Sequence, residues 1–187
     1  MRITGGLIRG VPIKAPKGMR TRPTSDKVRE AMFETLGGHV VDAEVLDLFA
    51  GSGALGIEAL SRGASHAVFV DNSTHATPII NDNLKKTGLS KKGQIIRADF
   101  RLAIKKLEKA ERKFDLIFID PPYEGGLHEE IAAHLGKHSI NHPDTIIVVE
   151  HFKKTELPHD ISGIPLVRTR NYGQTALSYF SVSSEWA

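Results

Sequence analysis

The segment DLFAGSGALG, from Asp47 to Gly56, decides the fold of this chain. It joins an apolar strand pattern, VLDLF, to a helical pattern, ALGIEALSR, which ends at Gly63. Gly51, Gly53 and Gly56 form the pattern G-x-G-x-x-G, in which glycine permits a tight turn and a close approach of the backbone to a ligand. The segment therefore predicts a nucleotide-type site at the end of a strand, although alone it would serve NAD equally well.

The alternation of strand and helix continues downstream of this segment. The patterns predict strands over 67–71, 94–99, 114–120 and 145–150, and helices that end at Gly88 or span 101–108 and 127–137. Either Ser73 caps the helix that ends at Gly88, or Thr77 caps it with Pro78 in first place. Strict alternation predicts a parallel sheet with helices on both faces.

The last two predicted strands, 165–170 and 176–182, break this pattern. Only the residues NYGQT separate them, which is too short for a parallel crossover, so the two strands are expected to pair antiparallel. The expected fold class is therefore α/β. It is a Rossmann-like S-adenosylmethionine (SAM) methyltransferase sheet, mostly parallel, with an antiparallel C-terminal strand.

The N-terminal part differs from the rest in charge. Residues 2–14 are expected to form a small β-hairpin, and a helix capped by Thr24 or Ser25 runs to about Leu36. Residues 1–30 hold eight basic and two acidic residues, a net +6 within a total of +3, which leaves −3 for the remainder. We interpret residues 1–38 as an RNA-binding extension and residues 39–187 as the methyltransferase domain; a solubilising surface hairpin is the alternative.

The composition sets limits on the function. The chain has 187 residues, of which 40% are hydrophobic and 25% charged, as in ordinary globular proteins, and no apolar run reaches membrane-spanning length. The absence of cysteine excludes disulfides, thiolate catalysis and cysteine-ligated metals. His134, His138 and His142 are interpreted as a solvated helix face rather than a metal site. We expect a cytoplasmic protein with neither membrane attachment nor metal.

Three acidic residues favour SAM over NAD. Asp47 lies inside the first strand, where its charge would repel a pyrophosphate and attract the α-amino group of SAM. Asp71, 20 residues after Gly51, suits ribose hydroxyls, and Asp99 could meet the adenine amino group with Phe100 packed on the ring. The alternative is that these acids only cap helices. Phe49 and Asn72 complete the predicted cofactor site.

The segment DPPY, Asp120-Pro121-Pro122-Tyr123, follows an apolar strand. Two prolines end any β-ladder and fix the backbone there. The Asp120 carboxylate and the Pro121 carbonyl could accept hydrogen bonds from both N–H groups of an aromatic amine, while Tyr123 stacks on the base. These four residues are the predicted catalytic group, a clamp that orients a planar amine toward the sulfonium methyl.

With these motifs, the chain resembles the bacterial 16S ribosomal RNA (guanine-N2) methyltransferase D family. The resemblance rests on DPPY, on DLFAGSGALGIEALSRGA, on RPTSDKVREAMF and on YGQTALSYF, and it covers nearly the whole chain. It implies methyl transfer from SAM to the N2 amine of a guanine in 16S rRNA, within a small-subunit ribonucleoprotein, by a monomer. It also implies that Arg22 and Thr24 border the SAM and base site.

Two alternatives stay open. A DNA adenine-N6 or protein-glutamine methyltransferase would share the DPPY segment, although 187 residues leave no room for a target-recognition domain. A non-catalytic ribosome assembly factor could retain SAM binding, although an intact DPPY segment argues against it.

Overall fold

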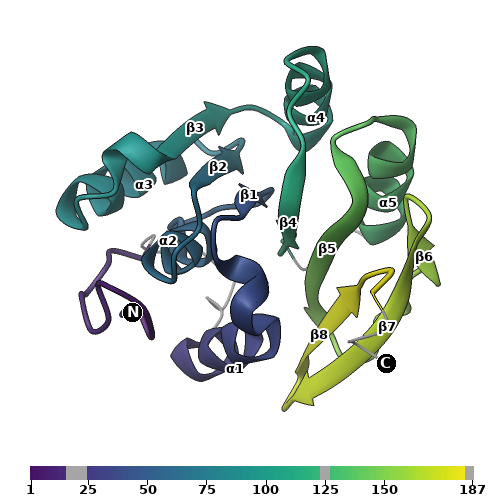
Figure 1. The fold of residues 1–187 in the computed structure, drawn as a ribbon, viewed down its shortest axis with the longest axis horizontal. Coiled ribbons are helices and arrows are strands. Elements are labelled where there is room, and N and C mark those ends of the chain that lie inside the picture. The colour runs from purple at the N-terminus through teal and green to yellow at the C-terminus, as the bar shows by residue number, and fades with distance from the viewer. Residues whose placement is uncertain (16–24, 123–126, 184–187) are drawn as a thin grey trace.

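A computed structural model describes residues 1–15, 25–122 and 127–183 of the chain (Figure 1). Its centre is an eight-stranded sheet with the order β3-β2-β1-β4-β5-β8-β7-β6. The strands are β1 Glu44–Asp47, β2 His66–Asp71, β3 Gly93–Arg97, β4 Phe114–Ile119, β5 Asn141–Phe152, β6 Asp160–Ile161, β7 Ile164–Tyr172 and β8 Thr175–Phe180. Strands β1 to β5 pair parallel, whereas β8 pairs antiparallel with both β5 and β7. The predicted fold class is confirmed.

Five α-helices cover the two faces of this sheet in the described parts of the chain. They are α1 Asp26–Leu36, α2 Ala54–Ser61, α3 Ala76–Lys86, α4 Phe100–Lys109 and α5 Leu127–Lys137. Figure 1 shows α1, α2 and α3 on one face and α4 and α5 on the other. The buried side chains divide accordingly into two hydrophobic clusters, one between the sheet and α1–α3 and one between the sheet and α4–α5. Strands buried on both faces account for the continuous apolar runs of the sequence.

The N-terminal segment folds back on itself and packs against the first cluster. A single antiparallel bridge joins Arg2 to Pro12, and the Ile3 N–H donates to the Val11 carbonyl. Ile3 and Ile13 are buried in the same cluster as Met32 of α1. The expected hairpin is therefore present in irregular form and shares the core of the sheet. The division of the chain at residue 38 stays a prediction.

Some element ends differ from the sequence-based expectation. Ser25 caps α1 by accepting from the Val28 N–H at 3.2 Å. Helix α3 begins at Ala76, and neither Ser73 nor Thr77 caps it. The Ser73 hydroxyl accepts from the His75 N–H, and the Thr77 hydroxyl donates to the Ser73 carbonyl. The sequence patterns also missed β6 and the first residues of β5, which carry few apolar side chains.

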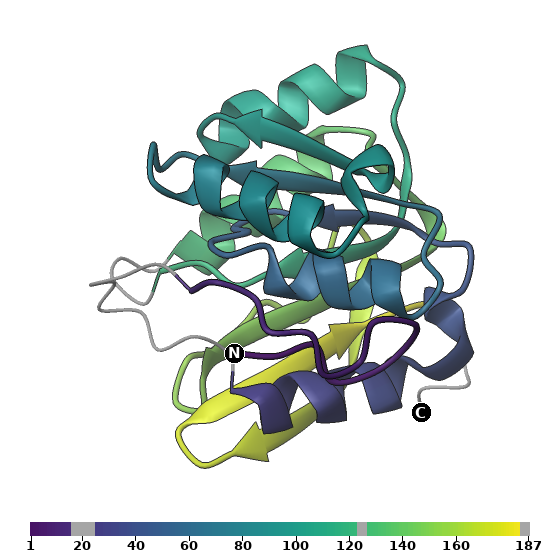
Figure 2. The ribbon, with the colours of Figure 1, turned by 90° about the vertical axis from the view of Figure 1, so that its left-hand side faces the viewer.

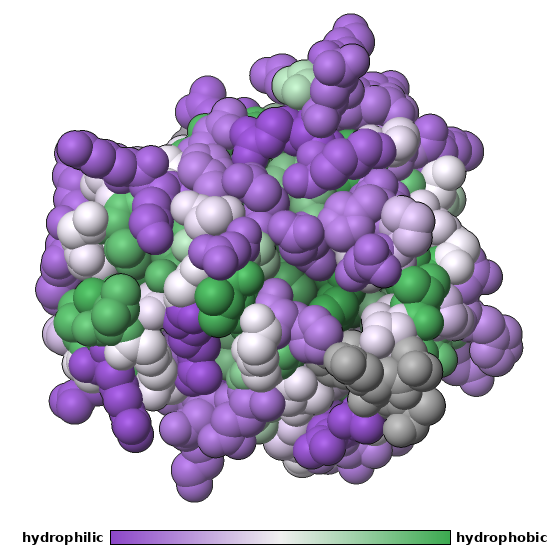
Figure 3. Space-filling model, viewed as in Figure 1, coloured by the Kyte–Doolittle hydropathy of each residue, from purple (hydrophilic) through white to green (hydrophobic). Residues whose placement is uncertain are grey.

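The surface seen in Figure 3 is mainly hydrophilic, with apolar side chains in separate small groups. In the parts of the chain that the structure describes, every helix is too short or too polar to cross a membrane.

Candidate active site at the β1–β4 switch point

The strand order reverses its direction between β1 and β4. The chain proceeds from β1 outward to β2 and β3 on one side, and from β4 outward to β5 on the other. In open α/β sheets, ligands bind at such a point, beyond the carboxyl ends of the strands. The Leu48 N–H donates to the Phe118 carbonyl at 3.0 Å and the Ala50 N–H to the Val70 carbonyl at 2.8 Å, so the glycine loop emerges between β4 and β2.

Asp71 holds the start of the glycine loop. Its Oδ2 accepts from the Gly51 N–H at 2.8 Å, and its Oδ1 accepts from the Ser73 N–H at 2.8 Å. An ionised carboxylate has about four acceptor positions, so Asp71 keeps capacity for two ligand hydroxyls. Gly51 has a φ of +55°, and a Cβ atom there would meet open space within 4 Å. The remaining acceptor positions of Asp71 and the open space beside Gly51 are compatible with the predicted ribose contact, which stays a prediction.

Gly56 has a packing role that differs from ligand contact. A Cβ atom at Gly56 would lie 2.3 Å from the Phe69 ring on β2, so only glycine lets α2 approach the sheet this closely. Gly53 precedes α2 with a φ of +79°, a left-handed conformation that glycine adopts without strain.

Asp47 is the buried acid beneath this loop. Its side chain is 1% exposed, and its Oδ2 accepts from the Gly56 N–H at 3.1 Å. Burial raises the pKa of Asp47 to about 7; the hydrogen bond from Gly56 opposes this shift, and the negative charge of Asp71 adds to it. Near neutral pH, Asp47 is therefore only partly ionised, and a bound cation such as an ammonium group would favour its charged form.

Asp99 and Phe100 lie at the start of α4. Asp99 caps this helix by accepting from the Arg101 N–H at 2.9 Å, and it also pairs with the Arg101 guanidinium at 2.8 Å. The Phe100 ring is only 4% exposed, with the Phe49 ring 5.6 Å away and the Arg101 guanidinium 4.4 Å above it. Helix capping thus accounts for Asp99 at least in part. The carboxylate of Asp99 is half-exposed, and the contact of Asp99 and Phe100 with adenine stays a prediction.

Asp120 follows directly after β4, next to the glycine loop. It is half-buried, Pro121 is buried and Pro122 is exposed, whereas the predicted site residues Tyr123, Arg22 and Thr24 lie outside the described residues. The pairing of Ile119 with Val149 brings the following residues, Asp120 and Glu150, side by side. Glu150 is 3% exposed. The sequence analysis did not identify it as a site residue. The available signal was its position, because Glu150 is the last residue of an apolar strand pattern, as Asp71 and Asp120 are.

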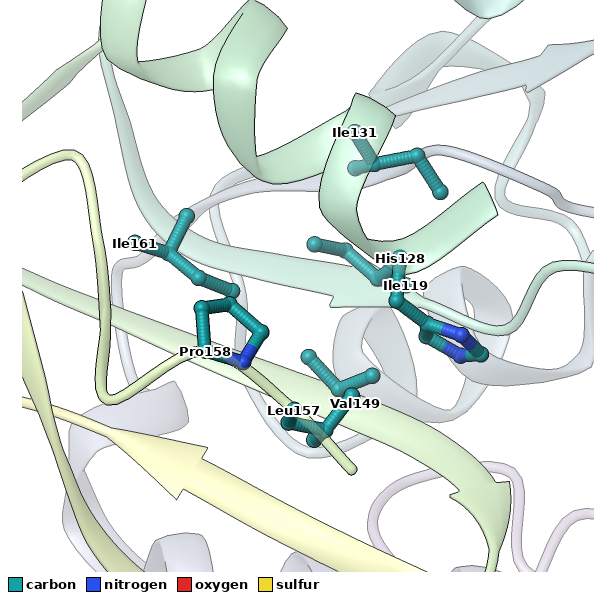
Figure 4. Close-up of a pocket in the computed structure, with 7 residues that line it drawn as sticks. All are labelled: Ile119, His128, Ile131, Val149, Leu157, Pro158 and Ile161. Atoms are coloured by element: carbon teal, nitrogen blue, oxygen red, sulfur yellow. The ribbon is translucent and has the colours of Figure 1, made fainter. Parts of the chain in front are cut away.

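A small cavity lies between the ends of β4 and β5 and helix α5, on the face of the sheet that carries α5 (Figure 4). Its volume is about 10 Å³, enough for roughly one water molecule. It is lined by Ile119, His128, Ile131, Val149, Leu157, Pro158 and Ile161. Neither the acids nor the glycines of the predicted site line it, so we assign it no ligand.

The interpretation of the three histidines as one helix face is wrong, because only His134 lies on α5, whereas His138 follows that helix and His142 belongs to β5. His138 Nδ1 lies 2.7 Å from Glu108, His142 Nε2 lies 2.9 Å from Asp115, and His134 Nδ1 lies 3.1 Å from the Glu130 carbonyl. Among the described residues, His, Asp and Glu side chains form no group of three or more that could hold a metal ion.

The charge of the N-terminal extension is partly neutralised in the fold. Arg29 is fully buried and pairs with Glu58 and Asp26, and Lys14 pairs with Asp82. These two basic residues therefore contribute less to a surface potential than the sequence count implied. Arg2, Arg9 and Lys27 remain exposed.

Comparison with known proteins gives consistent matches over almost the full chain. Residues 1–181 match the family model described as "Conserved hypothetical protein 95". The chain is 38% identical to the Bacillus subtilis protein named "Putative rRNA methyltransferase YlbH", covering 96% of this chain and 98% of that protein. It is 34% identical to the "Ribosomal RNA small subunit methyltransferase D" of Escherichia coli K12, covering 94% and 87%. A solved structure of a hypothetical protein from Thermus thermophilus superposes with a TM-score of 0.84 at 29% identity, covering 97% and 99%.

Proposed function

Because this chain belongs to the conserved hypothetical protein 95 family, and is similar in sequence to ribosomal RNA small subunit methyltransferase D proteins, we propose that it is a SAM-dependent rRNA methyltransferase that modifies guanine N2. The target is a guanine in 16S rRNA, within a small-subunit ribonucleoprotein, and the protein acts as a monomer without a metal.

The observation that carries this proposal is the placement of Asp71 and Asp120 on either side of one glycine loop. Asp71 holds the loop through Gly51 and keeps acceptor capacity for ribose hydroxyls, while Asp47 lies below the loop for the α-amino group. Asp120 ends the neighbouring strand β4, at the position from which a second substrate would meet the first. The methyl donor and the methyl acceptor therefore have adjacent binding positions.

SAM, when bound, supplies an electrophilic sulfonium methyl. The residues of this chain orient the amine, because a guanine N2 lone pair is delocalised into the base and makes a poor nucleophile. The Asp120 carboxylate and the Pro121 carbonyl accept from the two N–H groups and direct the lone pair toward the methyl. The N–C bond forms as the S–C bond breaks, and the amine then gives one proton to Asp120 or to water.

The exposed Arg2, Arg9 and Lys27 favour a nucleic-acid substrate over a protein one. We propose that residues 1–38 contribute RNA contacts from this position beside the sheet. A DNA adenine-N6 methyltransferase remains the second candidate, because the same acceptor pair would suit the adenine amine.

Methyl transfer from tritiated SAM to four substrates tests the proposal. The substrates are 16S rRNA transcribed in vitro, small subunits from cells lacking this gene, double-stranded DNA, and ribosomal protein. We expect incorporation into rRNA or subunits only, with N2-methylguanosine as the labelled nucleoside by mass spectrometry. Label in N6-methyladenine of DNA, or in glutamine, would identify one of the other enzyme functions. SAM binding without transfer to any substrate would identify the assembly factor.

A further inference from the structure

The register of the sheet places an arginine in line with the predicted catalytic edge. Glu150 of β5 pairs with Leu177 of β8, and Leu177 pairs with Arg170 of β7. Asp120 stands at the other end of the same row, beside Glu150. Because neighbouring strands lie about 4.8 Å apart, the backbone of Arg170 is about 14 Å from that of Asp120.

A second arginine lies on the same face of this hairpin. Arg168 pairs with Tyr179, and Tyr179 packs in the cluster between the sheet and α1. Burial raises the pKa of Tyr179 to about 12, and the positive charges of Arg170 and Arg168 act in the opposite direction. Directly paired residues of antiparallel strands point to the same face, so Arg168 and Arg170 share with Tyr179 and Leu177 the face of the sheet that carries α1.

Two lysines and two aromatic rings lie at the tip of the β7–β8 hairpin and at the adjoining end of β5. Lys153 and Lys154 are exposed in the turn after β5, and the Lys153 N–H donates to the Gln174 carbonyl in the β7–β8 turn at 2.9 Å. Phe152 is 45% exposed. It pairs with Thr175 of β8, and Thr175 pairs in turn with Tyr172 of β7, so the three residues form one row across the sheet. Figure 2 shows the tip of the β7–β8 hairpin at the end of the molecule where α1 begins.

The cations at this end of the sheet differ in their partners from four other arginines of the fold. Within the described parts of the chain, the side chains of Lys153, Lys154, Arg168 and Arg170 form no ion pair. By contrast, Arg29, Arg62, Arg101 and Arg112 each pair with a carboxylate. The two arginines of β7 and the two lysines after β5 therefore give this surface a local positive potential.

We propose that this surface, the hairpin patch formed by Phe152, Lys153, Lys154, Arg168, Arg170 and Tyr172, binds the RNA strand that flanks the target nucleotide. This inference rests on the proposed function. The lysines and arginines contact phosphates, and the two rings stack on bases, which is the combination that single-stranded nucleic acid requires. The competing explanation is that charged side chains on β7 only protect an edge strand from association.

Two double variants, Lys153→Gln/Lys154→Gln and Arg168→Gln/Arg170→Gln, test the patch in the full-length protein. Lys105→Gln/Lys106→Gln is the matched control, because these two lysines are exposed on α4, on the opposite face of the sheet. Binding to 16S rRNA transcribed in vitro is measured by fluorescence anisotropy between about 50 and about 200 mM salt, a range over which phosphate contacts change affinity strongly. S-adenosylhomocysteine binding, measured by calorimetry, reports on folding.

Each patch variant should lower the slope of log affinity against log salt by about 0.7 for every phosphate that the substitution leaves without a cation. The control variant should keep the wild-type slope. Phe152→Ala should weaken RNA binding by about 5- to 150-fold without changing the slope, because stacking releases no counterions. S-adenosylhomocysteine affinity should stay at the wild-type value in all variants.

Patch variants that keep the wild-type slope and affinity but associate with one another would overturn the inference in favour of edge protection. Such a result leaves the proposed function intact if the wild type still methylates RNA. A wild-type protein that neither binds nor methylates rRNA would overturn both proposals. Equal reductions of the slope in the patch and control variants would show a general charge effect and would likewise contradict a specific patch.

Discussion

The Nε atom of Arg29 lies 3.1 Å from the Oε2 atom of Glu58, and both side chains are fully buried. The same Glu58 carboxylate accepts from the N–H groups of Thr4 and Gly5 at 2.8 and 2.7 Å. One acid of α2 thereby joins the N-terminal segment, α1 and the helix that follows the glycine loop. The predicted RNA-binding extension and the predicted cofactor loop are thus held in a fixed relation.

Glu58→Gln should strongly destabilise the protein, because it removes the only fully buried carboxylate that pairs with the buried Arg29 guanidinium and leaves the half-exposed Asp26 as its remaining counter-charge among the described residues. Removing one partner of a buried pair typically costs about 3–5 kcal/mol. Each kcal/mol lowers Tm by about 2–4 °C for a chain of this size. The matched control is Glu44→Gln, which removes a half-exposed pair with Arg112 and should change the free energy of unfolding by less than about 1 kcal/mol. Similar unfolding midpoints for the two variants would contradict a special role for Glu58.

The raised pKa of Asp47 should make the free energy of unfolding fall as pH rises. The unfolded chain releases this proton near the ordinary pKa of 3.8, whereas the folded protein keeps it up to about 7. Between these values the folded state binds more protons, so the free energy of unfolding falls by up to about 1.4 kcal/mol per pH unit. Asp47→Asn keeps an acceptor for the Gly56 N–H and removes this titration.

Urea unfolding of ligand-free protein between about pH 4.5 and about pH 7.5, which brackets this window, measures the effect. Asp47→Asn should gain stability relative to the wild type as pH rises. The surface variant Asp144→Asn should follow the wild-type curve. Parallel curves for Asp47→Asn and the wild type would mean that Asp47 titrates at its ordinary pKa.

Asp71→Ala should weaken S-adenosylhomocysteine binding by about 1–3 kcal/mol, the range for hydrogen-bonding groups left without a partner. The variant removes the predicted ribose acceptor and also the contact that holds Gly51. Calorimetry measures the affinity, and Asp82→Ala on the surface of α3 is the control, with no expected change. Wild-type affinity in Asp71→Ala would place the cofactor elsewhere.

The sequence predicted the sheet well because its strands are buried on both faces and are therefore continuously apolar. It also identified Gly51 and Asp71, which the fold joins by a hydrogen bond. It could not show that Gly56 serves helix packing against Phe69, since that contact depends on the angle between α2 and the sheet. Nor could it show that Arg29 is buried, because a buried and an exposed arginine look alike in a charge count.

Asp120 should govern methyl transfer rather than cofactor affinity. Asp120 follows β4, and its proposed role there is to orient the weakly nucleophilic acceptor amine and to offset the positive charge formed on nitrogen. Asp120→Ala should therefore abolish turnover on rRNA while S-adenosylhomocysteine affinity stays close to the wild-type value. The effect of this substitution should appear in kcat more than in KM.

Asp120→Asn distinguishes the two parts of this role. The amide keeps one acceptor oxygen for an amine N–H but loses the negative charge, so activity should fall less than in Asp120→Ala. Tritium transfer under single-turnover conditions measures the chemical step, and calorimetry with S-adenosylhomocysteine shows that the fold and cofactor site are intact. Equal reductions of activity in the two variants would mean that charge, and not hydrogen bonding, carries the effect. Wild-type turnover in Asp120→Ala would show that the amine is held by other residues, and the clamp assigned to Asp120 and Pro121 would then be wrong.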